Sequence, residues 1–266
     1  TGYVWATANG TTTGLLEGVY AEVTSPAATS AAYVLVDGTG NITGGTTGVY
    51  ASNLGAGDTT VSGSGNTEGD AGDGIDAFSV AGNVLVNRTG TVSGSVNGIH
   101  AASTGGGNVT VTGVGNTSGT TGDGIYAVAS GGNGYVLVTP AGTVSGVAGI
   151  DAEAAGTGTV TVTTATGAAG NVTGTSSDGI YAISADGNIA ITNNAALVSG
   201  ALNGARAISS GLGAITVDGA GTYTGNTGDG ITAVENGAGP GAGHTGIHIT
   251  GTGNTMTCYV MSEPRA

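Results

Sequence analysis

A tetrad of glycine, a branched aliphatic residue, any residue and alanine recurs along this chain about every 26 residues. The copies begin at Gly18, Gly48, Gly74, Gly98, Gly124, Gly149, Gly179, Gly204 and Gly230. In the copy at Gly204 alanine replaces the branched residue. A strand-like repeat of this length is typical of stacked coils, each of which contacts only its neighbours. The chain is therefore expected to form an elongated solenoid.

Two further segments recur within each period. One is a short alternating run such as Asn83–Val86, and the other is a Gly-Thr-Val-Ser-Gly run such as Gly90–Gly94. Glycine-rich corners separate the three segments, which predicts three short strands per coil. We therefore expect an all-β parallel β-solenoid of roughly ten coils. Residues 1–257 should form this single domain, and residues 258–266 a tail outside the repeat.

Side chains alternate between the two faces of a strand, so the register of each coil can be predicted. In the tetrad strand the aliphatic residue and the alanine should point inward, and the residue between them outward. Equivalent side chains of successive coils, such as Ile75, Ile99, Ile125 and Ile150, should then stack in rows inside a narrow tube.

Composition narrows the set of partners. The chain has 57 Gly, only 3 Lys or Arg residues and a net charge of −14. So few cations cannot form a basic face, which argues against binding to nucleic acid or to anionic lipid. No apolar run is long enough to cross a bilayer, so we expect no membrane insertion by this segment. With Cys258 as the sole cysteine, no disulfide forms within the chain.

Aspartates precede the tetrad strand at every second coil. They are Asp73, Asp123, Asp178 and Asp229, and Asn97, Ala148 and Asn203 occupy the positions between them. Like charges directly opposite on neighbouring strands are destabilising. We interpret the alternation as a way to separate carboxylates within a continuous sheet.

Runs such as Gly122–Ala127, followed by glycine-rich corners and Val-Thr-Val-Thr, resemble the repetitive passenger regions of bacterial autotransporters and related adhesins. The resemblance covers residues 1–257. It implies a right-handed parallel β-helix displayed outside the cell, at the bacterial cell surface. The resemblance is consistent with a segment of a longer passenger and also with a free filament subunit.

The outward residues of the tetrad strand form a candidate ligand-binding row. Its members are Tyr20, Tyr50, Asp76, His100, Tyr126, Asp151 and Tyr181. Tyrosines in such a row could stack on sugars. The alternative is ordinary cross-strand packing on a sheet surface.

The outward centre of the alternating strand carries a second candidate surface. Leu35, Leu85 and Leu137 recur there with threonines between them. Regularly exposed leucines suggest a self-association stripe. A continuous threonine array would suggest ice binding, but leucine interrupts it at every second coil.

One metal site and one catalytic pair can be proposed from spacing. Asp70, Asp73 and Asp76 could supply oxygen ligands to Ca²⁺, but they lack the rhythm of calcium-binding β-rolls, and the preferred interpretation is a polar turn without a metal. Asp151 and Glu153 both point outward and could act on a polysaccharide as paired carboxylates. No histidine has a partner at zinc spacing and no nucleophile elbow is present. We expect no cofactor.

These observations together predict an extracellular structural or adhesive rod with no catalytic role. Its partners would be copies of itself, joined end to end or laterally, or a glycan or protein of a host or surface. A polysaccharide-binding or polysaccharide-cleaving β-helix is the alternative function.

Overall fold

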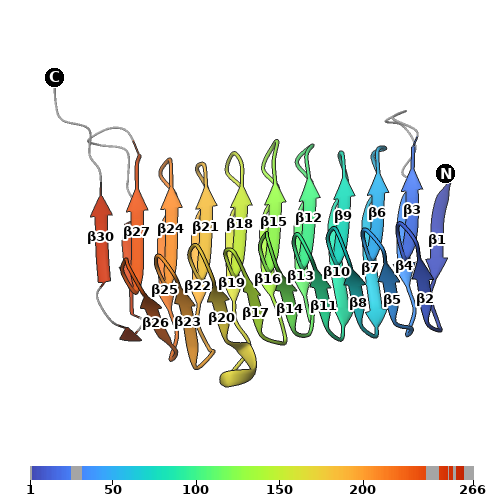
Figure 1. The fold of residues 1–266 in the computed structure, drawn as a ribbon. Coiled ribbons are helices and arrows are strands. Elements are labelled where there is room, and N and C mark those ends of the chain that lie inside the picture. Colours follow the sequence, from blue (N-terminus) through green and yellow to red (C-terminus); the bar gives the residue numbers. More distant parts are fainter. Residues whose placement is uncertain (1, 25–31, 238–245, 251, 254–255, 261–266) are drawn as a thin grey trace.

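Three long parallel β-sheets run along one axis and enclose a narrow core (Figure 1). The structure is a computed structural model that describes residues 2–24, 32–237, 246–250, 252–253 and 256–260. Within this part of the chain each sheet has ten strands, and every coil contributes one strand to sheet A, then one to sheet B, then one to sheet C. The predicted β-solenoid with three strands per coil is confirmed.

Sheet A contains the alternating segments. Its strands are β1 (Tyr3–Thr7), β4 (Tyr33–Asp37), β7 (Thr59–Ser64), β10 (Val84–Thr89), β13 (Val109–Thr112), β16 (Val136–Thr139), β19 (Val160–Thr163), β22 (Ile189–Thr192), β25 (Ile215–Asp218) and β28 (Ile247–Ile249).

Sheet B contains the shortest strands. They are β2 (Thr12–Gly14), β5 (Ile42–Gly44), β8 (Thr67–Gly69), β11 (Val92–Gly94), β14 (Thr117–Gly119), β17 (Val144–Gly146), β20 (Val172–Gly174), β23 (Leu197–Gly200), β26 (Thr222–Gly225) and β29 (Thr252–Gly253). A short 3-10 helix, η1 (Ala168–Gly170), precedes β20.

Sheet C contains the tetrad strands. They are β3 (Val19–Val23), β6 (Val49–Asn53), β9 (Ile75–Ser79), β12 (Ile99–Ser103), β15 (Ile125–Ala129), β18 (Ile150–Ala154), β21 (Ile180–Ser184), β24 (Ala205–Ser209), β27 (Ile231–Glu235) and β30 (Met256–Val260). Residue 257, the predicted end of the repeat, lies inside β30, so the sheet continues to Val260.

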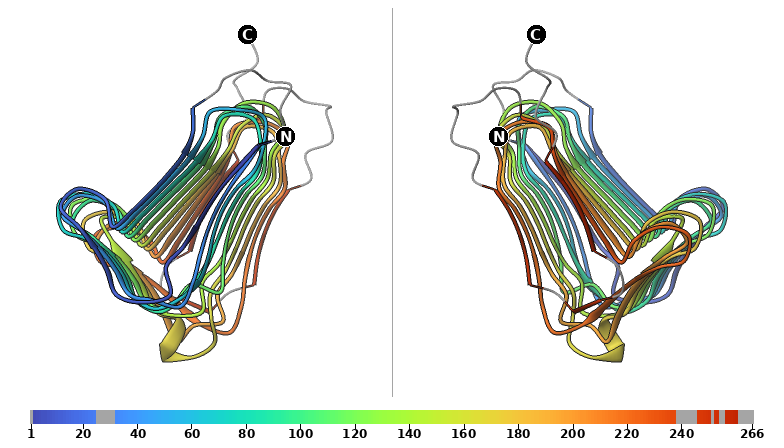
Figure 2. Two further views of the ribbon diagram at one scale, coloured as in Figure 1. Left: turned by 90° about the vertical axis from the view of Figure 1, so that its right-hand side faces the viewer. Right: turned by 90° about the vertical axis from the view of Figure 1, so that its left-hand side faces the viewer.

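The solenoid is right-handed. Viewed from its N-terminal end, the chain turns clockwise as it recedes through the successive coils (Figure 2, left). No helix among the described residues is long and apolar enough to cross a membrane.

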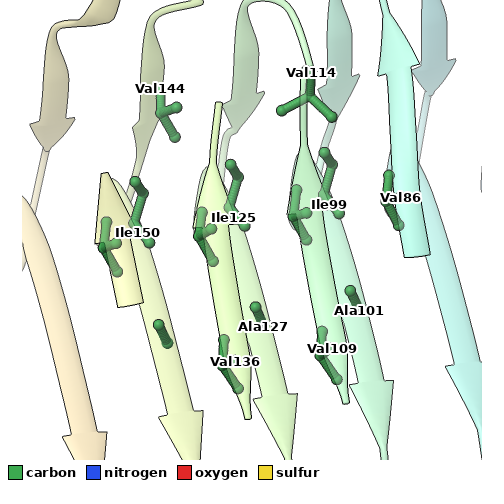
Figure 3. Packing of buried hydrophobic residues seen from close by; sticks show 14 of the residues in the cluster. Val86, Ile99, Ala101, Val109, Val114, Ile125, Ala127, Val136, Val144 and Ile150 are labelled. Atoms are coloured by element: carbon green, nitrogen blue, oxygen red, sulfur yellow. The ribbon is translucent and has the colours of Figure 1, made fainter. Parts of the chain in front are cut away.

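The core consists of side-chain rows that run parallel to the axis. Ile75 pairs with Ile99, Ile99 with Ile125, and Ile125 with Ile150, and each of these side chains is fully buried. Figure 3 shows the isoleucines and the alanines of sheet C stacked opposite the valines of sheet A. Burial of each Val or Ile contributes roughly 1.5–3 kcal/mol. The predicted inward register is confirmed.

Asn and Asp side chains fix the corners of the coils. At many corners a side-chain oxygen accepts a hydrogen bond from the backbone N–H of the equivalent residue one coil further on. Before sheet B, Asn41 accepts from the backbone N–H of Asn66. Before sheet A, Asp58 accepts from Asn83, and before sheet C, Asp123 accepts from Ala148. These bonds pair backbone donors that the irregular corners would otherwise leave unpaired.

Arg88 is fully buried inside the tube, in phase with the inward valines of β10. Its register partner is Gly63, which has a φ of 104° and no side chain to fill the space. The guanidinium group donates to Thr67 Oγ1 at 2.7 Å and to the carbonyl oxygens of Gly38, Gly40 and Ser62. One side chain thus ties its own coil to the two preceding coils.

In the tetrad copy that lacks a branched residue, a small inward side chain is accompanied by a large buried one on a neighbouring strand. Ala205 occupies the inner row of sheet C, and Tyr223 is fully buried in the inner row of sheet B, where its register partner is Val198. Strands β24 and β26 lie in contact. An isoleucine at position 205 would add volume on a strand next to the one that carries the buried Tyr223 ring.

Candidate functional site

The predicted outward row of sheet C exists as a continuous line of register partners. Tyr20 pairs with Tyr50, Tyr50 with Asp76, Asp76 with His100, His100 with Tyr126, Tyr126 with Asp151, and Asp151 with Tyr181. Arg206 and Thr232 continue the line. The structure therefore brings all seven predicted residues onto one face, which we call the sheet C row.

Rings in the sheet C row stack on each other along the axis. Tyr20 and Tyr50 have centroids 5.0 Å apart, and His100 and Tyr126 have centroids 5.3 Å apart, with nearly parallel planes in both pairs. The Arg206 guanidinium lies 5.6 Å from the centre of the Tyr181 ring. Stacking covers one face of each ring in these pairs, so that face is closed to a ligand. Binding of a ligand by the row stays a prediction.

Asp73, Asp76 and His100 form a cluster at the middle of the row. The Asp76 carboxylate lies 3.0 Å from Nδ1 of His100, and one ligand atom from each of the three residues lies within 4.8 Å of the others. All three side chains are half-buried. Burial raises the pKa of Asp73 against the opposing effect of the hydrogen bond from Asn97. Burial alone would lower the pKa of His100, but the hydrogen bond and the charge of Asp76 outweigh it, so the pKa of His100 is raised.

Asp70 does not belong to this cluster. It is exposed at the turn after β8, where its backbone N–H donates to the carbonyl oxygen of Gly44. The spacing of three aspartates predicted a set of oxygen ligands, but the structure places an imidazole beside the second and third aspartates instead. The sequence could have indicated His100 as a neighbour of Asp76, because His100 occupies the next position of the sheet C row, one coil further on.

Asp151 and Glu153 lie at neighbouring outward positions of β18, as predicted. The Asp151 carboxyl has one oxygen that is buried and has no hydrogen-bond partner among the described residues. Burial, with smaller contributions from Glu153, Asp123 and Asp178, raises the pKa of Asp151 to about 8. The same carboxyl therefore holds its proton at neutral pH.

A shallow hollow adjoins Glu153. It is lined by Glu153 together with apolar side chains of the neighbouring coils, among them Val128 and Ile183. Burial also raises the pKa of Glu153. A protonated carboxyl next to a second carboxyl can donate and accept protons, the minimum needed for acid–base work on a bound sugar.

The predicted leucine stripe lies on the outer face of sheet A. Leu35, Leu85 and Leu137 are half-buried, and Thr60 and Thr110 lie between them in register. Shallow depressions adjoin these threonines. The interrupted threonine array expected from the sequence is therefore present.

Aromatic residues extend this surface beyond the prediction. Trp5 is 59% exposed and pairs with Leu35 at the head of the stripe. Tyr3 and Tyr33 stack beside it with ring centroids 5.4 Å apart. The signal was available in the sequence, since Tyr3–Trp5 matches the alternating segment of later coils.

Comparison with known protein families, with characterised proteins and with solved structures finds no match for this chain. The geometry alone defines the class of protein, a parallel β-solenoid.

Proposed function

We propose that this chain is a rigid structural rod of the cell exterior, of the adhesin or filament-building kind, which acts by presenting its faces to other molecules. The observation that carries the proposal is the unbroken register of the three sheets. Buried rows and hydrogen-bonded corners hold the coils at ~4.8 Å steps, so side chains on each outer face stand at fixed, repeated intervals. Such a surface suits contact with another repetitive molecule.

The outer face of sheet A is the face that we assign to contact with a second copy. Its central column contains Trp5 and the three stripe leucines, and no charged residue occurs there from Trp5 to Thr216. Copies of a chain with a net charge of −14 repel each other. An uncharged, partly apolar column is where that repulsion is weakest and where apolar burial can offset it.

The test measures self-association of the full chain by sedimentation velocity over a range of concentrations. A triple variant, L35T/L85T/L137T, carries threonine at every coil of the stripe and should shift the distribution towards monomer. The matched control is L15T/L202T, which changes two exposed leucines away from sheet A. If the wild type stays monomeric throughout, or if both variants behave alike, this assignment fails.

Action on a polysaccharide is the second candidate function, and the unpartnered Asp151 oxygen beside Glu153 favours it. We expect any cleavage of a glycan by the purified chain to disappear in D151N and in E153Q, with folding checked by circular dichroism. Cleavage that survives both substitutions would remove these two residues from the site.

A further inference from the structure

We propose that Asp73, Asp76 and His100 bind one divalent transition-metal ion of the Zn²⁺ class on the sheet C row. The site joins two successive coils, because the aspartates belong to the β9 coil and the histidine to β12. It differs in ligands and in metal from the calcium site that the aspartate spacing suggests.

The geometry already approaches that of a coordination shell. Zinc binds histidine nitrogen and carboxylate oxygen at about 2.0–2.2 Å, which places ligand atoms roughly 3–3.5 Å apart around the ion. The Asp76 oxygen and His100 Nδ1 are 3.0 Å apart, and the Asp73 carboxylate lies within 4.8 Å of both. Small rotations of the aspartate side chains would close the remaining gap.

Two of the ligands are held in place by residues outside the cluster. Asn97 donates to Asp73 Oδ1 from its backbone nitrogen at 2.8 Å and from Nδ2 at 3.0 Å. The Tyr126 ring stacks on the His100 ring with planes 7° apart, which fixes the orientation of the imidazole. Partners that orient ligands in this way are a common part of metal sites.

The ligand types select the class of ion. One imidazole and two carboxylates suit zinc and neighbouring first-row metals, whereas Ca²⁺ prefers six to eight oxygen ligands. Three protein ligands leave a fourth position open, and because the cluster is half-buried on an outer face, that position faces solvent or a partner molecule.

Hydrogen bonding at the corner accounts for an aspartate at position 73, but it does not account for Asp76 or His100. Asp123 and Asp178 occupy the same corner position as Asp73, yet tyrosine follows each of them at the row position. Asp76 adds a second carboxylate beside Asp73, which costs electrostatic energy in the absence of a cation. A bound divalent ion turns this repulsion into attraction.

The experiment titrates the full chain, freed of metal, with Zn²⁺ alone in a calorimeter and follows the histidine ¹⁵N resonances. The wild type should bind zinc and the His100 ring resonances should shift. Affinity should fall by about tenfold or more in H100N and in D76N. The matched controls, D70N and H248N, should bind as the wild type does.

Three results would overturn the proposal. They are the absence of zinc binding, equal affinity in the wild type, H100N and D76N, and loss of binding in H248N in place of H100N. Preferential binding of Ca²⁺ that D70N weakens would instead support the site suggested by the aspartate spacing. Should a variant fail to fold, the His100 resonances of the wild type decide the question alone.

Discussion

Asp178 accepts two hydrogen bonds from Asn203, the residue at the same corner one coil further on. The donors are the backbone nitrogen at 2.9 Å and Nδ2 at 2.8 Å. Asn203 Oδ1 in turn accepts from the backbone nitrogen of Asp229 at 2.9 Å. Alternation of Asp and Asn thus does more than separate charges, because the amide supplies a donor that a carboxylate lacks.

Replacement of Asn203 by aspartate should destabilise the rod. N203D removes the Nδ2 donor and places a third carboxylate between Asp178 and Asp229. We expect a loss of about 2 kcal/mol at low salt and a smaller loss at high salt, since salt screens the repulsion. N203A removes the same donor and also the Oδ1 acceptor of Asp229, but it adds no charge, so its loss of about 1–2 kcal/mol should be insensitive to salt. Urea denaturation at two ionic strengths measures both; equal salt dependence would contradict the charge argument.

Arg88 should be among the most sensitive positions of the chain. In R88M the guanidinium donors disappear, and Thr67 Oγ1 and the buried carbonyl oxygen of Gly40 lose their arginine partner. Loss of one partner from a buried polar network costs about 3 kcal/mol. R206M is the control, because Arg206 lies on the outer row over Tyr181, where such a contact contributes about 0.5–1 kcal/mol. Similar midpoints for the two variants in thermal unfolding would argue against the internal role of Arg88.

Replacement of Ala205 by the isoleucine found in other copies of the tetrad should lower the stability of the protein as long as Tyr223 is present. A205I adds volume beside the buried ring and is expected to cost about 1–3 kcal/mol through overpacking. The double variant A205I/Y223V follows the pattern of the other coils and should recover most of this loss. A double-mutant cycle from denaturant unfolding measures the coupling, and additive effects would show that the two positions are independent.

Asp151 should make the protein less stable as the pH rises. Its pKa is raised from 3.8 to about 8, so the native state holds a proton that the unfolded state releases near pH 4. Stability contributed by the neutral carboxyl is therefore complete below pH 4 and declines from there to about pH 8. The groups that face it are Glu153, Asp123 and Asp178, together with the rings of Tyr126 and Tyr181.

D151N keeps the shape of this side chain and removes its charge. One pKa unit corresponds to about 1.4 kcal/mol, so after allowance for solvent access D151N should exceed the wild type in stability by on the order of 3 kcal/mol at pH 8. At pH 4 the two should be similar. Unfolding free energies across this range test the prediction, with D70N as an exposed carboxylate control. A parallel decline in D151N and the wild type would contradict it.

Several features of the site could be predicted from the sequence and several could not. Strand alternation placed Tyr126 and Asp151 correctly on one outer face, since a residue between two inward residues must point out. Arg88 lies in phase with the inward valines of β10, but the sequence pattern did not single it out and gave no sign of its partners. Spacing within one corner suggested Asp70 as a companion of Asp73, whereas the neighbour in space came from the next coil.

The sequence alone determined the coil length, the three strands per coil and the side-chain rows, because a repeated strand pattern allows one register in which every apolar residue is buried. Only the tertiary structure showed which side chains contact each other between coils and at the corners. The carbonyl oxygens around Arg88, the space beside Ala205 and the approach of His100 to Asp73 all depend on backbone turns and on side chains of different coils. The residues that meet at these points are far apart in sequence, and the stacking of one coil on the next brings them together.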